Sequence, residues 1–297
     1  MSLPNAPQTL RAAADAILEL HEDGRLTEAL AACDQLLERA VELGDPVTRE
    51  SAFTAWYERA VLLAEVGELD ASASAALAAS DALPFDRHDP DQTHELAMLL
   101  VHAGTCLGAL GAPEDALAVY DRLVSELEDA DDPVTRGQVV RGQVNRAATL
   151  LALERHREAL DVATALAREL GGAVTGDDAE QLGMTQRIRA AALRGLGRAE
   201  AAVVALAEAE MLAGVTEVGA RSQAAAAQCE RARLLAELGR GDEAIALLER
   251  TVPRFTDDPA VSDAVAELRL LEAELLDAAG HHDRAAELRA AVGQVTA

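Results

Sequence analysis

The side chains best suited to ligand chemistry in this sequence are its arginines, which supply all of the positive charge apart from histidine. The chain has 26 arginines and no lysine, against 52 aspartates and glutamates. A guanidinium is a planar fork of N–H donors that binds a carboxylate or a phosphate through two parallel hydrogen bonds. Arginines that the fold brings together would therefore form an anion site in a chain whose formal net charge is −26.

Motifs for catalysis or cofactor binding do not occur in the sequence. The segment LRGLGRAE (193–200) lacks the spacing of a phosphate loop, and HExxH, CxxC and a nucleophile elbow are absent. We interpret four histidines as residues of surface loops and not as metal ligands: His88, His94 and the adjacent pair His281 and His282. A metal site needs ligands that converge from fixed positions. We therefore expect no enzyme activity, no metal and no cofactor.

The three cysteines do not suggest disulfide or zinc chemistry. Cys33, Cys106 and Cys229 are odd in number and far apart in the sequence. Cysteines with this spacing are expected to act as small apolar fillers of the core.

Composition predicts an all-α protein. Half of the 297 residues are hydrophobic, only 2% are aromatic, and glycine and proline fall in short spots between long periodic runs. The acidic charge argues against nucleic acid and anionic membranes as partners. No apolar run approaches the roughly 20 residues of a membrane span, and the start MSLPNAPQTL lacks the features of a signal peptide. A cytoplasmic location is the expectation.

The elements that would position the arginines come from a repeated helix–turn–helix signal. Seven turn positions are spaced by 43, 44, 43, 43, 42 and 41 residues: Gly24, Gly67, Gly111, Glu154, Gly197, Gly239 and Gly280. A small residue follows each turn by five: Ala29, Ser72, Ala116, Ala159, Ala202, Ala244 and Ala285. A leucine precedes each by four: Leu20, Leu63, Leu107, Leu150, Leu193, Leu235 and Leu276. Small residues let paired helices approach closely, and glycine ends the first helix in a left-handed cap.

Asp-Pro pairs mark the starts of the first helix in several copies. The pentapeptide DPVTR occurs at 45–49 and 132–136, and Asp89-Pro90 and Asp258-Pro259 have the same form. Aspartate is a good N-cap, and proline suits the first helical turn because its missing N–H is not needed there. We interpret the repeated pentapeptide as cap chemistry.

These features resemble the tetratricopeptide repeat (TPR). The resemblance rests on a small residue late in the first helix (Ala60, for example), glycine at the turn, EAL-type openings of the second helix, and Trp56. It covers about residues 8–294, although the period exceeds the usual 34 residues and the usual proline ending the second helix is missing. Longer helices of this kind are found in the sensor domains of some bacterial regulators. The resemblance implies a right-handed α-solenoid of about seven antiparallel helix hairpins, because one hairpin cannot bury its own apolar face.

We expect a single TPR-like domain over residues 1–297. Its repeats would occupy approximately 8–44, 45–87, 88–131, 132–174, 175–214, 215–256 and 257–297. The first hairpin departs from the pattern, with Ile17 where a small residue belongs, as a terminal cap would.

In TPR-like arrays the first helices line a concave groove, so the resemblance also implies a ligand face. The candidate groove residues are Tyr57, Met98, His102, Arg141, Asn145, Met184, Arg187, Arg194 and Arg233. The four arginines would bind carboxylates, and an asparagine can pin an extended peptide by donating and accepting hydrogen bonds. The methionines would add adaptable apolar contact. The competing interpretation is that the arginines pair internally with acidic residues such as Glu230.

Two further patches qualify this prediction. Trp56 is expected to pack between the two helices of its hairpin, and the last repeat turns acidic at Glu267, Glu274 and Asp277. A positive middle and an acidic end would favour a ligand bound in one direction.

Three functions follow as hypotheses. The first is a non-catalytic scaffold or adaptor that binds a protein or peptide, either acidic or with a free C-terminal carboxylate. The second is a regulatory module that senses a small metabolite or signalling peptide and works with a separate effector. The third, weaker hypothesis is a homo-oligomeric assembly protein, such as a homodimer formed through its terminal hairpins.

Overall fold

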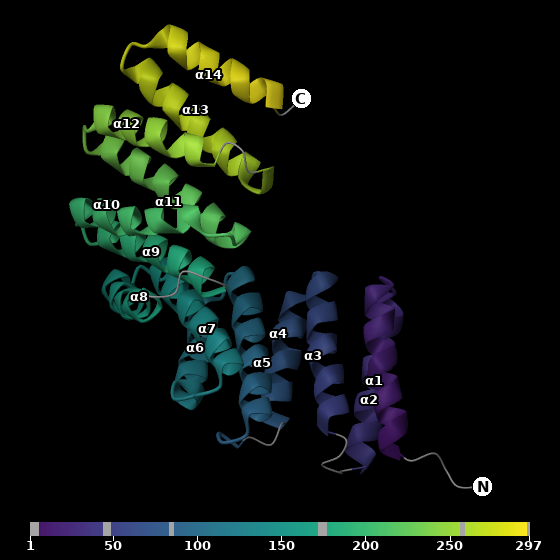
Figure 1. The fold of residues 1–297 in the computed structure, drawn as a ribbon. Helices are drawn as coiled ribbons and strands as arrows, with labels where there is room; N and C mark the ends of the chain where they lie inside the picture. Colours follow the sequence, from purple (N-terminus) through teal and green to yellow (C-terminus); the bar gives the residue numbers. More distant parts are fainter. Residues whose placement is uncertain (1–5, 44–48, 83–85, 172–176, 256–258, 296–297) are drawn as a thin grey trace. The chain divides into compact units, whose positions relative to one another are not determined.

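The computed structural model describes residues 6–43, 49–82, 86–171, 177–255 and 259–295, and most of them are helical (Figure 1). The described ranges contain fourteen α-helices and no strand. This confirms the predicted all-α class of antiparallel helix hairpins. The α-helices are α1 (Ala6–Glu22), α2 (Leu26–Leu43), α3 (Arg49–Glu65), α4 (Leu69–Ala82), α5 (Pro90–Ala109), α6 (Pro113–Leu127), α7 (Pro133–Ala152), α8 (His156–Leu170), α9 (Asp177–Gly195), α10 (Ala199–Glu208), α11 (Val218–Glu237), α12 (Gly241–Thr251), α13 (Ser262–Ala278) and α14 (His282–Val295).

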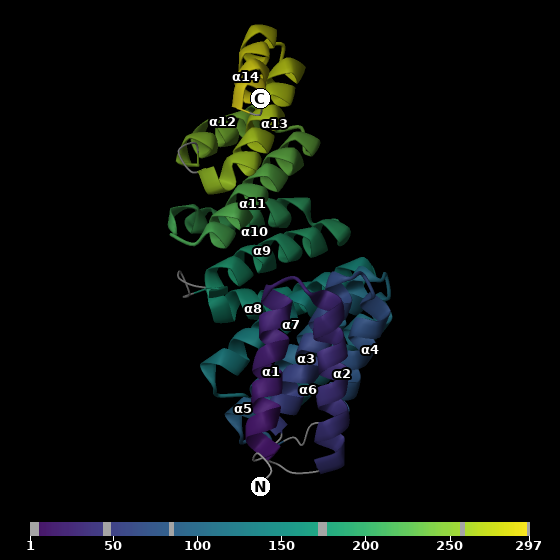
Figure 2. The same ribbon diagram turned by 90° about the vertical axis from the view of Figure 1, so that its right-hand side faces the viewer.

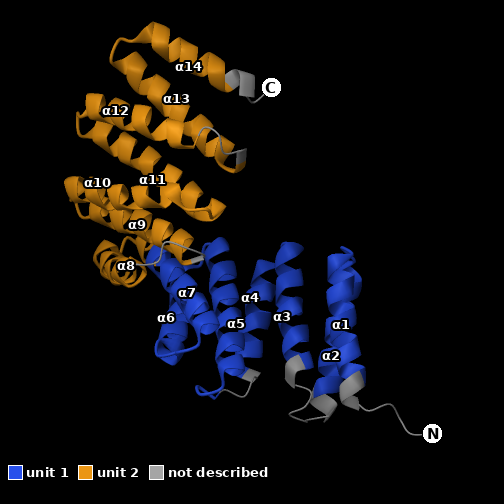
Figure 3. Ribbon diagram, viewed as in Figure 1, with its two compact units in different colours: residues 1–149 blue, residues 150–297 orange. Residues whose placement is uncertain are grey.

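The chain divides into two compact units, each a stack of helices (Figure 3). Unit 1 covers Met1–Thr149 and unit 2 covers Leu150–Ala297, so the division falls near the end of α7. Within unit 1, α1 packs on α2 and α3, and α5 packs on α4 and α6. Within unit 2, α9 packs on α8, α10 and α11, and α13 packs on α14 (Figures 1 and 2). Odd-numbered helices are the first helices of hairpins, and even-numbered helices are the second.

The turns between the paired helices adopt the predicted left-handed conformation. All six turn glycines have positive φ, from 71° at Gly24 to 86° at Gly280. Glu154 occupies the same position in the fourth hairpin with φ 56°, a conformation that costs a side chain about 1 kcal/mol or more. The hydrogen bonds are also the same, because Gly111 N–H donates to Gly108 O at 3.1 Å and Glu154 N–H donates to Leu151 O at 2.9 Å.

Small side chains at the helix crossings are buried as predicted. The residues five positions after the turns, Ala29, Ser72, Ala116, Ala159, Ala202, Ala244 and Ala285, are all 0% exposed. Ile17 of the first hairpin is buried too, at the crossing where later copies have alanine or glycine. Small side chains at these positions allow the two helices of a hairpin to approach closely.

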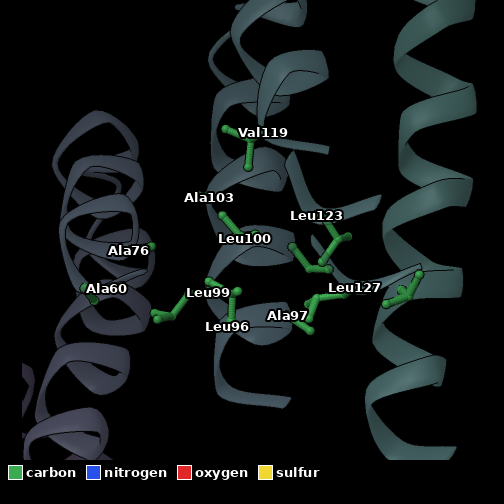
Figure 4. Close-up of a cluster of buried hydrophobic side chains, with 13 residues drawn as sticks. Ala60, Ala76, Leu96, Ala97, Leu99, Leu100, Ala103, Val119, Leu123 and Leu127 are labelled. Carbon is green, nitrogen blue, oxygen red and sulfur yellow. The ribbon is translucent and has the colours of Figure 1, made fainter. Parts of the chain in front are cut away.

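Leucines fill the spaces on either side of α5 in unit 1 (Figure 4). Leu99 and Leu100 of α5 and Leu123 of α6 are 0% exposed. Full burial of each such side chain stabilises the fold by about 1.5–3 kcal/mol. This core supports the α3, α5 and α7 side chains described below.

The predicted Asp-Pro caps are confirmed at the two pairs that the structure describes. The carboxylate of Asp89 accepts from the N–H groups of Asp91 and Gln92 at 3.1 and 3.3 Å, with Pro90 in the first turn. Asp132 accepts from Thr135 N–H at 2.8 Å, and that bond lowers the pKa of its carboxyl. Asp45, Pro46 and Asp258 lie outside the described residues.

A search of the described helices found none that is long and apolar enough to cross a membrane.

Candidate functional site

Three first helices of unit 1 carry five of the nine predicted groove residues. Helix α3 positions Tyr57, α5 positions Met98 and His102, and α7 positions Arg141 and Asn145. We call these five residues the unit 1 face.

Tyr57 links the unit 1 face to the core. Its ring is half-buried, stacks on Phe53 at 5.9 Å between centroids, and lies 6.1 Å from the ring of His102. Burial raises the pKa of the Tyr57 phenol, the nearby carboxylate of Glu58 raises it further, and Arg141 opposes the shift.

Arg141 differs from most arginines in the molecule because its guanidinium is not paired with a carboxylate of the protein. Its side chain is exposed, and it forms no hydrogen bond or ion pair with any residue in the described part of the chain. An exposed guanidinium without an internal partner is able to bind an anionic group.

Asn145 lies one helical turn further along α7, beside a small polar group. Its Nδ2 donates to Thr105 Oγ1 at 3.5 Å, and the Thr105 hydroxyl lies 3.5 Å from the Tyr120 hydroxyl. Burial raises the pKa of Tyr120, while Thr105 and Asn145 oppose that shift. Asn145 is half-buried, so part of its amide is available on the face.

His102 is partly occupied by an internal contact that the sequence did not predict. Ser72 Oγ donates to the Ala60 carbonyl at 2.6 Å and lies 2.8 Å from His102 Nε2 and 3.4 Å from Cys106 Sγ. Because the Ser72 proton is used by the carbonyl, its oxygen accepts from His102 Nε2–H. Burial lowers the pKa of His102 and favours the neutral ring.

This serine–histidine–cysteine contact is not arranged for nucleophilic catalysis, since the serine proton points away from the histidine. The sequence did carry a signal for it. Ser72 is the only hydroxyl among the seven small residues that follow the turns.

The remaining four predicted groove residues, Met184, Arg187, Arg194 and Arg233, lie in unit 2, where the arginines are paired. Arg187 donates through Nε to Glu230 Oε1 at 2.8 Å and through Nη1 to Gln223 Oε1 at 2.8 Å. Arg194 bonds Glu237 at 3.1 Å, and Arg233 bonds Glu267 at 2.9 Å. Each pair joins one first helix to the next first helix, from α9 to α11 or from α11 to α13.

Internal pairing therefore accounts for three of the four arginines predicted to form a positive cluster. Glu230 is the carboxylate that the competing interpretation named. Met184 is half-buried on α9.

The two further patches predicted from the sequence, at Trp56 and in the last repeat, are also in contact with neighbouring side chains. Trp56, which was predicted to pack between the two helices of its hairpin, is half-buried against the unit 1 core and lines an open groove with Leu37 of α2 and Ala75 of α4. In the last repeat, Asp277 pairs with His282 at 2.9 Å and with Arg289.

The cysteines behave as the predicted core fillers. Cys33, Cys106 and Cys229 are free and buried. Burial raises the pKa of the Cys33 and Cys229 thiols to about 12, which leaves them unreactive. Among the described residues, no group of three or more histidines, cysteines or carboxylates is placed to hold a metal ion.

Comparison with known proteins identifies the fold. No family model matches the sequence, and no curated protein matches it. The solved structure of the apo form of RapI is similar over 94% of this chain and 94% of that chain, with a TM-score of 0.61 and 10% identity. A tetratricopeptide repeat protein from Parabacteroides merdae ATCC 43184 is similar over 97% of this chain and 93% of that chain, with a TM-score of 0.58 and 14% identity.

A third similar structure is the apo form of the quorum sensor NprR from B. thuringiensis. The similarity extends over 99% of this chain and 89% of the NprR chain, with a TM-score of 0.55 and 10% identity. The chain therefore has a TPR-like fold, as the repeat pattern predicted.

Proposed function

We propose that the chain is a non-catalytic TPR-like scaffold or adaptor that binds a peptide or protein segment on the unit 1 face. The observation that carries the proposal is Arg141, an exposed guanidinium with no ion pair to any described residue in a strongly acidic chain. On a protein whose surface is otherwise mostly negative, such a group is a local site of attraction for a carboxylate.

The chemistry of the face favours a peptide that carries a carboxylate. Arg141 would bind an acidic side chain or a free C-terminal carboxylate through two hydrogen bonds. Tyr57 and Met98 would supply apolar contact, and Asn145 would donate and accept hydrogen bonds with the peptide backbone. His102 would contribute mainly through its half-buried ring, because its Nε2 is bonded to Ser72.

The unit 2 arginines have a different role in this proposal. Arg187, Arg194 and Arg233 hold neighbouring first helices in register through their glutamate partners. They add specificity only where a ligand displaces a glutamate.

The test is a selection from a display library of random peptides with free C-termini, followed by calorimetric titration of the enriched peptides. We expect wild type to enrich acidic peptides or peptides with a C-terminal carboxylate. Arg141→Glu should lower the affinity for these peptides by at least roughly tenfold. The melting temperature should stay unchanged, because Arg141 has no internal partner.

Arg39→Glu is the matched control, since Arg39 is an exposed arginine on second helix α2 of the same unit. It makes the same change in net charge away from the unit 1 face. Equal loss of affinity in both variants would mean that net charge alone governs binding. Enrichment of peptides without carboxylates would contradict the role given to Arg141.

A sensor that works with a separate effector is the second candidate. The likeness to the quorum sensor NprR favours it. In that case a selected peptide should compact the protein, measured as a smaller radius of gyration by small-angle X-ray scattering. A scaffold should keep the same radius with and without peptide.

A further inference from the structure

An open groove lies between two second helices in unit 2, on the side of α9 that faces α8 and α10. It has a volume of about 560 Å³. Its apolar part includes Leu160 of α8, Leu193 of α9 and Val204 of α10. Val204 is 58% exposed and so presents apolar surface to the groove.

Arginines surround this apolar strip. Arg168 of α8 and Arg198, at the start of α10, line the groove and are exposed, and their side chains make no hydrogen bond or ion pair with any residue that the structure describes. Arg189 lines it from α9 and pairs with Glu208 at 2.7 Å. The lining includes a single carboxylate, that of Asp161.

The corresponding groove of unit 1 has the opposite balance of charge. It lies between α2 and α4, over α3, and its lining holds Asp34, Glu38 and one arginine, Arg59. Arg59 and Arg189 both stand eight residues before their turn glycines, but Arg59 pairs with Asp34 at 2.8 Å.

Part of this difference lies fourteen positions after the turn, where Glu38 of the first hairpin is replaced by Arg168 in the fourth, and part lies at the residue ten positions after the turn. In the first hairpin it is Asp34, and in the fourth it is Thr164, which lines the unit 2 groove. The hydroxyl of Thr164 carries no charge, so the groove that begins on α8 lacks a carboxylate at the position of Asp34, and Arg189 pairs with Glu208 instead.

We propose that the groove between α8 and α10 is a second binding site, which takes an acidic amphipathic helix from a partner protein. The apolar face of that helix would cover Val204 and Leu160, and its carboxylates would bind Arg168 and Arg198. Amphipathic helices bind hydrophobic grooves between helices, whereas strand addition needs a sheet edge that the described residues do not offer. Because Arg168 and Arg198 have no internal partner, an acidic ligand neutralises them without breaking an existing ion pair.

Charge complementarity favours a partner protein over a small amphiphile or a second copy. Two arginines on two helices match carboxylates spaced along a helix better than one head group. A second copy would carry its own net charge of −26 into the contact.

The test is fluorescence anisotropy with a labelled synthetic peptide of about 16 residues, long enough to form a helix with leucines on one face and glutamates beside them. We expect wild type to bind the peptide. The double variant Arg168→Glu, Arg198→Glu should bind it with an affinity at least roughly tenfold lower. A scrambled peptide of the same composition, with no apolar face, should bind at least roughly tenfold more weakly than the ordered one.

The matched control is the double variant Arg11→Glu, Arg39→Glu. It changes net charge equally at two exposed arginines that do not line the groove.

Three outcomes would overturn the proposal. One is equal weakening in the two double variants, and another is no binding of the ordered peptide by wild type. The third is a wild-type dimer in sedimentation velocity that Arg168→Glu, Arg198→Glu dissolves, because the groove would then serve self-association.

Discussion

The first helices of the two units use their charged side chains differently. In unit 2, Arg187, Arg194 and Arg233 each bond a glutamate on the next first helix. In unit 1, Arg141 has no such partner, and His21 of α1 bonds Glu58 and Glu65 of α3 at 2.7 and 3.0 Å. An arginine on this scaffold is therefore structural where the next repeat offers a carboxylate and is available to a ligand where it does not.

The repeat period explains part of this difference. Glu230 and Glu237 follow Arg187 and Arg194 by 43 residues, one more than the 42 residues between the turns Gly197 and Gly239, whereas the residue 43 positions after Arg141 is Met184. Spacing does not identify every pair, because Arg233 bonds Glu267, which follows it by only 34 residues.

The largest contrast is expected at the leucines four positions before the turns. Leu150 of unit 2 is fully buried, but Leu107, its counterpart in unit 1, is only half-buried. Leu150→Ala should lower the free energy of unfolding by about 2–5 kcal/mol and Leu107→Ala by clearly less. Urea unfolding followed by circular dichroism measures both. An effect of under about 0.5 kcal/mol for Leu150→Ala would contradict its position in the helix crossing.

A packing difference within unit 1 should give the next largest effect. A Cβ built on Gly104 of α5 would lie 2.5 Å from the buried ring of Tyr120, while one on Gly108 meets nothing within 4 Å. Gly104→Ala should therefore destabilise by about 1–3 kcal/mol, less the gain in helix propensity. Gly108→Ala should stabilise by up to about 1 kcal/mol. Thermal melts of the two variants test the prediction, and a higher melting temperature for both would contradict it.

The comparison between units is tested most directly at the arginines. Arg187→Met removes hydrogen bonds to Glu230 and Gln223 in a partly buried setting. It should therefore lower the free energy of unfolding by about 0.5–1 kcal/mol. Arg141→Met should change the free energy of unfolding by less than about 0.5 kcal/mol. Chemical denaturation at two salt concentrations measures both values. Equal destabilisation by the two substitutions would mean that Arg141 has a structural role after all.

The smallest effect is a pH dependence confined to the His21 contact of unit 1. The imidazolium of His21 donates to Glu65 and Glu58, and these hydrogen bonds raise the pKa of His21 above 6.5 in the folded state. Its contribution to stability is complete below about pH 6.5 and is lost as pH rises through the raised folded pKa. The difference in free energy of unfolding between wild type and His21→Gln should therefore narrow as pH rises above about 6.5.

The control for that measurement is Arg187→Met, whose stability gap to wild type should stay constant over the same range because arginine does not titrate. A constant gap for His21→Gln would contradict a charged His21 in the folded protein.

The sequence predicted the hairpins well because their signals are local. Gly24 and its counterparts need only a left-handed turn, and Ala29 and its counterparts need only a close crossing, so period and residue type suffice. The candidate site was harder to predict, since the pairing of Arg187 depends on a side chain of the next repeat. The groove of Arg168 and Arg198 lies on second helices, which the family resemblance did not mark as a ligand face.

The packing order of the helices also has a consequence for how the protein folds. Within each unit the extensive contacts join helices that are adjacent or next-but-one in the sequence, such as α4 with α5 and α9 with α11. Contacting residues are therefore close together in the chain, and loop closure costs little entropy. Chains with such low contact order fold quickly, and a repeat stack can start from any hairpin and grow toward its neighbours.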